Sequence, residues 1–306
     1  MRTVAAVSAA LLGLVGCDNG KMHAHPPDAP PGPRWWKPTP GEARNWDLQV
    51  QAPFDLAPAR AMVAVDLWAL VPQALTLDYG DGDPVAVPAG ALAGSIVELH
   101  ARDPETVVIC HVATGAVRDT DPDARKFPAA SQGNTTGSAD QRYLDIRTAG
   151  RAAWAPAMWK RLALARQIGC DGVMPDKNDM VQFDAGWTLT PEEQTSWYAE
   201  VASQAHDRDL SVGLVNGQTV PGLYEDLVGD FDWLVIERCA EFDDCGATRP
   251  FLNQRKAVFA IDYTTDIDGA TLNPTSLCEA QEVAMIQDGL VKDTTLSSAT
   301  RTQCLP

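Results

Sequence analysis

Residues 190–216 read TPEEQTSWYAEVASQAHDRDLSVGLVN, and this stretch contains the repeating unit on which the fold prediction rests. Thr190 precedes a proline and two glutamates, a typical helix start in which a hydroxyl caps the first turn and acidic side chains lie near the positive end of the helix dipole. We expect this helix to run to about His206. The apolar run 210–215 then predicts a buried strand that ends at the polar Asn216.

The same alternation extends on both sides of this unit. Buried strands are predicted at residues 61–66, 106–112, 171–175, 233–236 and 256–262, with residues 47–51 as a candidate first strand. Helices are predicted at residues 91–101, 152–168, 223–228 and 275–288. Apolar strands that alternate with helices indicate a parallel sheet covered on both faces. We therefore predict a (β/α)8 barrel; the alternative is a doubly wound open sheet, whose dinucleotide-binding form no G-x-G-x-x-G turn supports.

Two acidic stretches interrupt the alternation. Residues 71–92 are expected to form a surface insertion, whose acidic stretch 78–83 is not followed by the glutamate that would complete a calcium-binding loop. We interpret this stretch as a solvated turn. Asp119, Asp121 and Asp123 receive the same interpretation.

The composition indicates a folded domain with an acidic surface. Of the 306 residues, 45% are hydrophobic, and 41 acidic against 24 basic residues give a formal net charge of −17. This charge argues against nucleic acid as a partner, because phosphate binding requires clustered cations. It suits a cationic or neutral ligand, although acidity also keeps proteins soluble. One large domain is expected, since α/β barrels often reach about 250 residues.

The first residues are expected to be a targeting segment. Arg2 precedes the apolar run 4–15, which is shorter than the about 20 residues of a spanning helix and has the size of a signal-peptide core. The run ends in Leu14-Val-Gly-Cys17, which resembles a bacterial lipoprotein signal in which the cysteine becomes the acylated first residue. An ordinary secretory signal with an incidental cysteine is the alternative.

The chain is accordingly divided into three segments. Residues 1–16 are assigned to a lipoprotein signal peptide, residues 17–45 to a proline-rich linker, and residues 46–306 to the barrel domain. Acyl chains on Cys17 would anchor the domain, so we expect an exported, membrane-anchored lipoprotein of a bacterial cell envelope. His23 and His25 are not expected to bind a metal, because a linker offers no fixed geometry.

Six further cysteines suggest disulfides, because their number is even and the chain is expected to be exported. Six cysteines allow fifteen pairings. The spacing is compatible with a small loop closed by Cys239 and Cys245, a C-terminal tail held by Cys278 and Cys304, and a remaining pair Cys110 and Cys170. A zinc site is the rival interpretation, but the sequence contains no C-x-x-C pair.

Polar residues stand where the predicted strands end. They are Asp66, His111, Thr114, Asp176, Asp179, Asn216, Glu237, Asp262 and Tyr263. In parallel α/β folds ligands bind at the carboxyl ends of the strands, so acids from four strand ends are expected to meet at one mouth. Two carboxylates across a cleft predict glycoside hydrolysis, in which one protonates the leaving oxygen and the other attacks the sugar or activates water. The alternative is that these acids cap helices or pair with arginine.

Ten sequence blocks follow one another between residues 46 and 263. They are Trp46-Asp-Leu-Gln49, Ala64-Val-Asp-Leu-Trp68, Val108-Ile-Cys-His-Val112, Asp119-Thr-Asp-Pro-Asp-Ala-Arg-Lys-Phe-Pro128, Tyr143-Leu-Asp-Ile-Arg147, Gly169-Cys-Asp-Gly-Val-Met-Pro-Asp-Lys-Asn-Asp179, Leu189-Thr-Pro-Glu-Glu-Gln194, Ala205-His-Asp-Arg-Asp-Leu-Ser-Val-Gly-Leu-Val-Asn216, Ile236-Glu-Arg-Cys239 and Arg255-Lys-Ala-Val-Phe259. Their order resembles glycoside hydrolase family 114, the endo-α-1,4-polygalactosaminidases.

This resemblance implies a (β/α)8 barrel that hydrolyses α-1,4-linked galactosamine polymers. It places the two catalytic acids at Asp176, as nucleophile or base, and Glu237, as general acid, with the reverse assignment left open. Other polar motif positions are candidates for substrate binding or support: Asp66, Asp145, Asp179 and Asn216. For Asp145 the alternative is an internal ion pair with Arg147, and for Asn216 it is a cap on the following turn.

Several positions depart from the family pattern: His111, Met174, Lys177, Val215, Ile236 and Arg238. Lys177 and Arg238 add positive charge at the predicted substrate site, where the usual substrate is itself partly cationic. Two hypotheses follow. The first is an endo-glycosidase that uses Asp176 and Glu237. The second is a non-catalytic, glycan-binding surface lipoprotein, which an ion pair between Lys177 and Asp176 would favour. We expect no cofactor and no metal, and a monomer whose partners are a polysaccharide and, through its lipid, a membrane.

Overall fold

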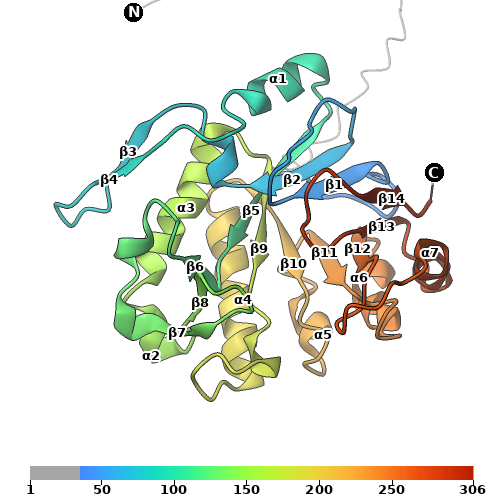
Figure 1. Cartoon of the computed structure of the whole chain (residues 1–306). Coiled ribbons are helices and arrows are strands. Elements are labelled where there is room, and N and C mark those ends of the chain that lie inside the picture. The colour runs from blue at the N-terminus through green and yellow to red at the C-terminus, as the bar shows by residue number, and fades with distance from the viewer. Residues whose placement is uncertain (1–34, 306) are drawn as a thin grey trace, which may run out of the picture. The chain divides into compact units, whose positions relative to one another are not determined.

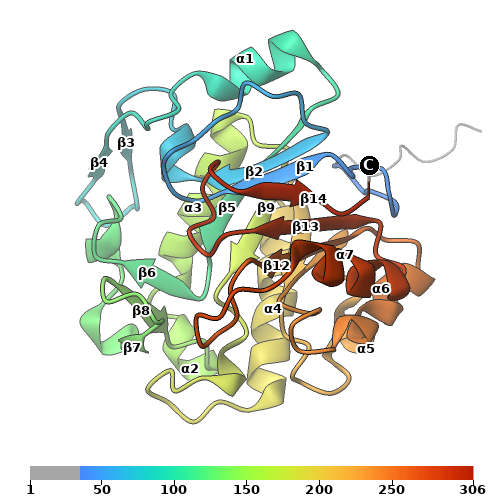
Figure 2. The same cartoon turned by 45° about the vertical axis from the view of Figure 1, so that its right-hand side comes forward.

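The computed structural model of this protein describes residues 35–305. The predicted signal peptide 1–16, Cys17, His23 and His25 lie outside the described residues. The described part is built around eight parallel strands, followed by one antiparallel strand, in a nearly closed sheet (Figures 1 and 2). Their order in the sheet is β1 (Trp46–Gln49), β2 (Met62–Asp66), β5 (Val107–Ala113), β9 (Gly172–Asp176), β10 (Ser211–Val215), β11 (Trp233–Glu237), β12 (Val258–Tyr263), β13 (Asp288–Lys292) and β14 (Arg301–Gln303). The predicted (β/α)8 fold is confirmed.

The eighth parallel strand, β13, is the one that the sequence did not predict. Its partner β14 runs antiparallel to it, and the Arg301 side chain donates to the Trp46 carbonyl on β1, 2.8 Å away. Lys292 on β13 also forms a buried ion pair with Asp47 on β1, at 2.6 Å. Side-chain contacts therefore join the first and last parallel strands where the barrel closes.

Helices cover the outside of the barrel (Figure 1). They are α1 (Ser95–Arg102), α2 (Thr148–Arg151), α3 (Ala155–Ile168), α4 (Pro191–His206), α5 (Leu223–Leu227), α6 (Arg249–Asn253) and α7 (Pro274–Val283), with the 3-10 turns η1 (Trp68–Leu70), η2 (Ala124–Lys126), η3 (Ala129–Ser131), η4 (Met180–Gln182) and η5 (Cys245–Thr248). The predicted start of α4 is confirmed: Thr190 and Glu193 form a reciprocal capping box, which satisfies two amides of the first turn.

Two cores result from the alternation of side chains along each strand. The barrel interior is filled by large apolar residues, among them Trp46, Met174, Trp233 and Phe259. The opposite faces of the same strands, for example Val173 on β9, pack against the helices. This two-sided burial explains why the strands are nearly continuous apolar runs.

Insertions follow the second and third strands of the barrel. The predicted insertion after β2 is a hairpin of β3 (Leu75–Leu77) and β4 (Val85–Val87), whose acidic turn binds Lys126 through Asp81. After β5 the chain forms an insertion sheet with the order β6 (Ala116–Arg118), β8 (Gln141–Leu144) and β7 (Gln132–Thr135) (Figure 1). This insertion sheet lies on the same side of the barrel as the loop after β9, because Gly115 contacts the Lys177 carbonyl.

The solvated-turn prediction is wrong for Asp121 and Asp123. Asp123 is fully buried and accepts two hydrogen bonds from Arg161 of α3, at 2.6 and 3.0 Å. Asp121 lies 2.9 Å from the same guanidinium. Local sequence indicates a turn, but only the tertiary fold brings a buried arginine from helix α3 against it.

Residues 35–45, the end of the predicted linker, contact the amino-terminal end of the barrel. Trp36 packs near the rings of Trp233 and Phe259, with centroid distances of 6.2 Å to each. Trp35 stacks on His206 at 4.3 Å and donates to Asp232. This segment therefore covers the floor of the barrel, opposite the mouth.

Three disulfides connect the six cysteines of the barrel domain. They are Cys110–Cys170, Cys239–Cys245 and Cys278–Cys304, which are the three pairs that the spacing suggested. The first joins β5 to the turn between α3 and β9, the second closes a loop directly after β11, and the third holds the C-terminal strand to α7. Within residues 35–305, no helix combines the length and apolarity needed to cross a bilayer.

Candidate active site

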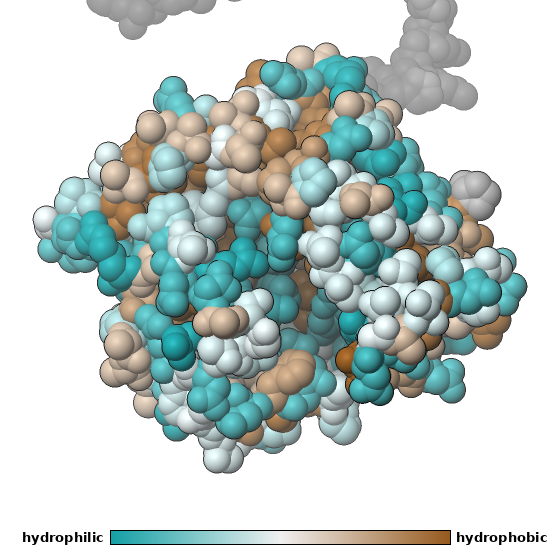
Figure 3. All heavy atoms as spheres, in the orientation of Figure 1, coloured by the Kyte–Doolittle hydropathy of each residue, from teal (hydrophilic) through white to brown (hydrophobic). Residues whose placement is uncertain are grey.

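Five polar side chains at the carboxyl ends of neighbouring strands share the inward-facing register of the barrel. Each stands two residues after a member of the interior core, and a strand repeats its face every second residue. They are Asp66 on β2, His111 on β5, Asp176 on β9, Glu237 on β11 and Tyr263 on β12. The surface in Figure 3 is hollowed near its middle, over the region where Figure 1 places β9 and β10, and hydrophilic side chains surround the hollow. We call this region the mouth.

Both oxygens of Asp176 are held by neighbouring polar groups. Its Oδ1 accepts from the Lys177 backbone amide at 2.7 Å, and its Oδ2 lies 3.3 Å from Lys177 Nζ and 3.2 Å from His111 Nε2. Burial by itself would raise the pKa of Asp176, but the Lys177 charge and the His111 contact outweigh it and hold that pKa well below its ordinary value. These contacts therefore favour the ionised form of Asp176.

Glu237 is oriented by three hydrogen bonds. The Asn216 amide donates to Glu237 Oε2 at 2.8 Å, and the Asn216 carbonyl oxygen accepts from the Glu237 backbone amide at 2.9 Å. The Tyr263 hydroxyl donates to the other oxygen, Oε1. Burial and the Glu237 charge raise the pKa of Tyr263 well above its usual range, so this hydroxyl stays a donor.

Asp179 lies at the bottom of the loop that follows β9. It is buried, and Gln182 donates to its Oδ2 at 2.8 Å. Burial, together with the charge of Asp176, raises its pKa from 3.8 to about 7. The neighbouring Asn178 is fully buried and accepts from Thr114 at 2.9 Å and from Trp197 at 2.8 Å, which anchors the loop.

Lys177 connects these acids electrostatically. The charge of Asp176, with smaller contributions from Glu237 and Asp179, raises the pKa of Lys177 well above its ordinary value. Asp176 and Glu237 also both act on the Tyr263 hydroxyl. The two acids that the sequence singled out therefore act on the same groups at one mouth.

The remaining candidates of the sequence analysis lie in different surroundings. Asp66 borders a small pocket with Trp68, Arg118 and His111, and its Oδ2 is 3.7 Å from Arg118 Nη1. Burial raises the pKa of Asp66. This pocket adjoins the Asp176 group through His111, so Asp66 is positioned as a candidate side subsite of the mouth.

Asp145, Asn216 and Arg238 make contacts that define their structural roles. Both oxygens of Asp145 accept from the Arg147 guanidinium at 2.8 Å, which is the internal ion pair that the sequence left open. Asn216 binds Glu237 instead of capping the following turn. The Arg238 guanidinium pairs with Glu241 and lies 4.5 Å from the Tyr263 ring centroid, so its charge is largely satisfied at the rim.

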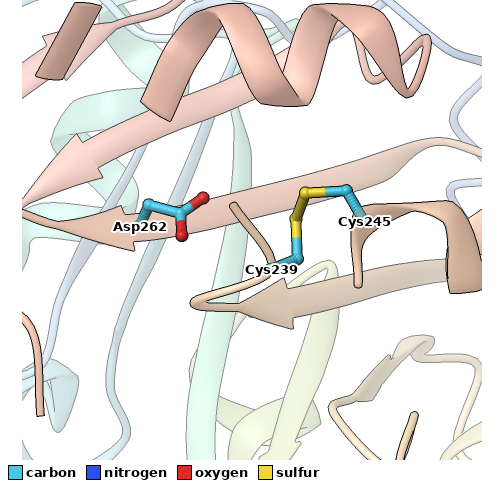
Figure 4. A group of neighbouring side chains, drawn as sticks. All are labelled: Cys239, Cys245 and Asp262. Atoms are coloured by element: carbon cyan, nitrogen blue, oxygen red, sulfur yellow. A yellow bond between two sulfur atoms is a disulfide. The ribbon is translucent and has the colours of Figure 1, made fainter. Parts of the chain in front are cut away.

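The expectation that acids from four strand ends meet is wrong for Asp262. Ile261 and Tyr263 belong to the interior core, so Asp262 faces the opposite side of β12 and is fully buried there. Its oxygens accept from the amides of residues 240 and 241 and from Gln281 on α7. Figure 4 shows Asp262 beside Cys239 and Cys245, a grouping that could hold a metal only as free thiols; the disulfide removes both thiolate ligands.

Two residues of the mouth were not selected as site residues from the sequence. His111 and Tyr263 were noted at strand ends, but the signal that identifies them is their register: each continues the inward-facing alternation of its strand. A third feature, the stack of Tyr143 on Phe183 at 6.1 Å, joins the insertion sheet to the loop after β9. No sequence pattern pairs these two rings, because they are 40 positions apart.

The raised pKa of Asp179 predicts how the stability of the folded protein changes with pH. In the unfolded chain this carboxyl has a pKa of 3.8, so the folded state, with a pKa of about 7, disfavours its ionisation. The folded protein should therefore lose stability as pH rises from about 4 to about 7, on the order of 1 kcal/mol per pH unit from this group. Asp179→Asn should lack this loss and be more stable than wild type at pH 8.

Urea unfolding of both proteins at pH 5 and pH 8 measures this difference. Asp184→Asn, an exposed substitution in the same loop, is the control and should follow the wild-type pH dependence. Equal pH dependence of wild type and Asp179→Asn would show that Asp179 is ionised without cost.

Comparison with known proteins gives one family and several related structures. The model of "Glycoside-hydrolase family GH114" matches residues 26–305. The structure is similar to Ega3 from Aspergillus fumigatus in complex with galactosamine, with 24% identity, a TM-score of 0.69, and coverage of 88% of this chain and 97% of that one. It is also similar to the glycoside hydrolase domain of PelA from Pseudomonas aeruginosa, with 17% identity, a TM-score of 0.56, and coverage of 84% and 96%. The search of curated proteins found no match.

Proposed function

The chain belongs to glycoside-hydrolase family GH114, and from this premise we propose that it is an endo-acting hydrolase of α-1,4-linked galactosamine-containing polysaccharide. The observation that carries the proposal is the pair of oriented strand-end acids, Asp176 and Glu237, at one barrel mouth. The galactosamine assignment is supported by the ten sequence blocks and by the galactosamine bound to the similar structure of Ega3.

The surroundings of the two acids suit different roles. Asp176 stays ionised beside Lys177 and His111, as a nucleophile or base must be. As a nucleophile, Asp176 attacks the anomeric carbon and forms a glycosyl-enzyme that water then hydrolyses; as a base, it takes a proton from the water that attacks that carbon. In either route the bond from the anomeric carbon to the glycosidic oxygen breaks as Glu237, in its protonated form, gives that oxygen a proton. Asn216 and Tyr263 fix the position of the Glu237 carboxyl.

The rim of the mouth supports a polymeric substrate. Phe183 is 49% exposed and stacks on Tyr143, whose pKa is raised to about 12 by burial and by the charge of Asp179. The exposed Phe242 lies next to Glu241 on the side of β11 and β12, where Ile267 donates its amide to Glu241. These exposed rings offer stacking surfaces to sugar units of a polymer, as endo-acting cleavage requires.

A second candidate function is glycan binding without turnover. The observation in its favour is the ion pair between Lys177 Nζ and Asp176 Oδ2 at 3.3 Å, because a carboxylate held by an ammonium is a weaker nucleophile. Such a protein would bind the same polysaccharide at the same mouth.

The two candidates are separated by incubating the purified chain with partly deacetylated α-1,4-galactosaminoglycan. The hydrolase should release new reducing ends, and an endo-acting enzyme should produce oligosaccharides of intermediate length first. Binding to the polymer with no new reducing ends over many hours would favour the non-catalytic protein. If the chain neither binds the polymer nor releases reducing ends from it, this polysaccharide is rejected as the substrate.

We further propose that the protein is an exported monomer, anchored to a bacterial envelope membrane by acyl chains on Cys17 after removal of residues 1–16. The three disulfides support an oxidising compartment. Expressed in a bacterial host, Cys17→Ser should shift most of the protein from the membrane fraction to the soluble fraction, because the acyl chains supply the anchoring energy. An unchanged membrane fraction would contradict lipidation at Cys17, and Asp184→Asn, an exposed substitution in the barrel domain, is the control.

A further inference from the structure

The contact of Lys177 with Asp176 is set by the backbone as well as by the side chain. Lys177 has a φ of 63°, in the left-handed region that few side chains adopt, and its carbonyl oxygen lies against Gly115. In this conformation its own amide donates to one oxygen of Asp176, while its ammonium reaches the other. One residue therefore occupies both oxygens of the predicted nucleophile.

The Lys177 ammonium is also the cation that faces the cluster of acids. Asp176, Glu237 and Asp179 all act on it, and its side chain is only 34% exposed. The second cation that departs from the family pattern, Arg238, is instead held by Glu241 and the Thr265 carbonyl at the rim. Without Lys177, the ionised Asp176 would lose its ammonium partner and could attract a cationic ligand.

A ligand ammonium placed against Asp176 would meet the Lys177 charge within a few ångströms. Like charges at that distance repel strongly where water is partly excluded, and the attraction that Asp176 could offer is already used by Lys177. An uncharged sugar substituent meets no such repulsion, and its oxygen can accept a hydrogen bond from the same ammonium.

We propose that Lys177 is a specificity-determining residue that selects an uncharged, N-acylated hexosamine unit over a free amino sugar at the position next to Asp176. This proposal rests on the proposed function and names the substrate class of that site. In this proposal the Lys177 ammonium takes the place beside Asp176 that a charged amine of the substrate would otherwise occupy.

The test compares two α-1,4-linked oligomers of equal length, N-acetylgalactosamine and galactosamine, at a pH below the pKa of the sugar amine. Wild type should cleave the acetylated oligomer with a kcat/KM at least 10-fold higher. Lys177→Asn should shift this ratio toward the free amine by 10-fold or more, since it exposes the acids. Asparagine tolerates left-handed backbone, so the variant should fold, which thermal unfolding checks.

Two controls separate charge from other effects. Lys160→Asn removes a cation from the exposed face of α3 and should leave the ratio unchanged. Raising the pH until the sugar amine is neutral should reduce the preference of wild type for the acetylated oligomer, because the repulsion disappears.

Binding of the same oligomers, measured by calorimetry, distinguishes the inference from the proposed function. Selective binding of the acetylated oligomer without cleavage would keep the inference and reject the hydrolase mechanism. Equal or better use of the galactosamine oligomer by wild type, or an unchanged ratio in Lys177→Asn, would reject the inference alone. Failure to bind either oligomer would reject both.

Discussion

Asp176→Asn and Glu237→Gln are each expected to lower the rate of polysaccharide cleavage by about 10²–10⁴-fold, the range for loss of a positioned acid, base or nucleophile. Asparagine at 176 cannot attack a sugar or accept the proton of water. Glutamine at 237 has no proton to give to the leaving oxygen, although its amide can keep the contacts to Asn216 and Tyr263. Substrate affinity should change far less than turnover, because both variants keep their shape.

The measurement is the initial rate of reducing-end release, with the affinity of each variant for the polymer determined separately. Asp184→Asn, in the exposed loop beside the mouth, is the matched control and should retain the wild-type rate. A rate within tenfold of wild type in Asp176→Asn would remove Asp176 from the mechanism. The same result in Glu237→Gln would require another proton donor, for which Asp179 is the neighbouring candidate.

Arg161→Met is expected to produce the largest loss of stability, about 3–5 kcal/mol, as removal of one partner from a buried ion pair does. The Arg161 side chain is 2% exposed and lies between Asp121 and Asp123 at 2.9 and 2.6 Å. Methionine of similar length would leave both carboxylates buried without their cation. It would also remove the contact of the guanidinium with the Phe127 ring, whose centroid is 4.7 Å away.

Urea unfolding measures this loss, and the chain offers a matched control one residue away. Lys160→Met makes a similar change on the exposed face of the same helix and should alter stability by less than about 0.5 kcal/mol. A difference between the two variants below about 1 kcal/mol would mean that water reaches Asp121 and Asp123. Arg161 also lines the pocket beside Asp66. Any loss of activity in Arg161→Met should therefore come from displacement of the loop that carries Asp121 and Asp123.

The ion pair between Lys177 and Asp176 bears on both the mechanism and the specificity of this chain. Burial raises the pKa of Asp176, but the charge of Lys177, together with the His111 contact, lowers it further and keeps the carboxyl ionised. The Lys177 ammonium also fills the space where a substrate cation would otherwise lie. The variant Lys177→Asn removes this ammonium and leaves Asp176 with the His111 contact and the backbone amide of residue 177, so it tests both roles of the ion pair.

The sequence by itself predicted seven of the eight parallel barrel strands, most of the helices in residues 35–305 and the barrel, and it singled out Asp176 and Glu237 as candidate acids. These predictions rest on patterns of neighbouring residues: continuous apolar runs, the cap at Thr190 and polar residues at strand ends. Such patterns can be recognised in the sequence alone. The strand β13 escaped prediction because its five residues, Asp288–Lys292, contain only two aliphatic side chains between polar ends.

Only the tertiary structure decided which strand-end residues share the mouth. Asp262 and Tyr263 are adjacent in the chain, yet they face opposite sides of β12, so the tyrosine reaches Glu237 while the aspartate binds Gln281. The burial of Asp123 and the stack of Tyr143 on Phe183 likewise depend on partners 38 and 40 positions away. Contacts between distant residues arise from closure of the barrel, and no local pattern of hydrophobicity or charge records them.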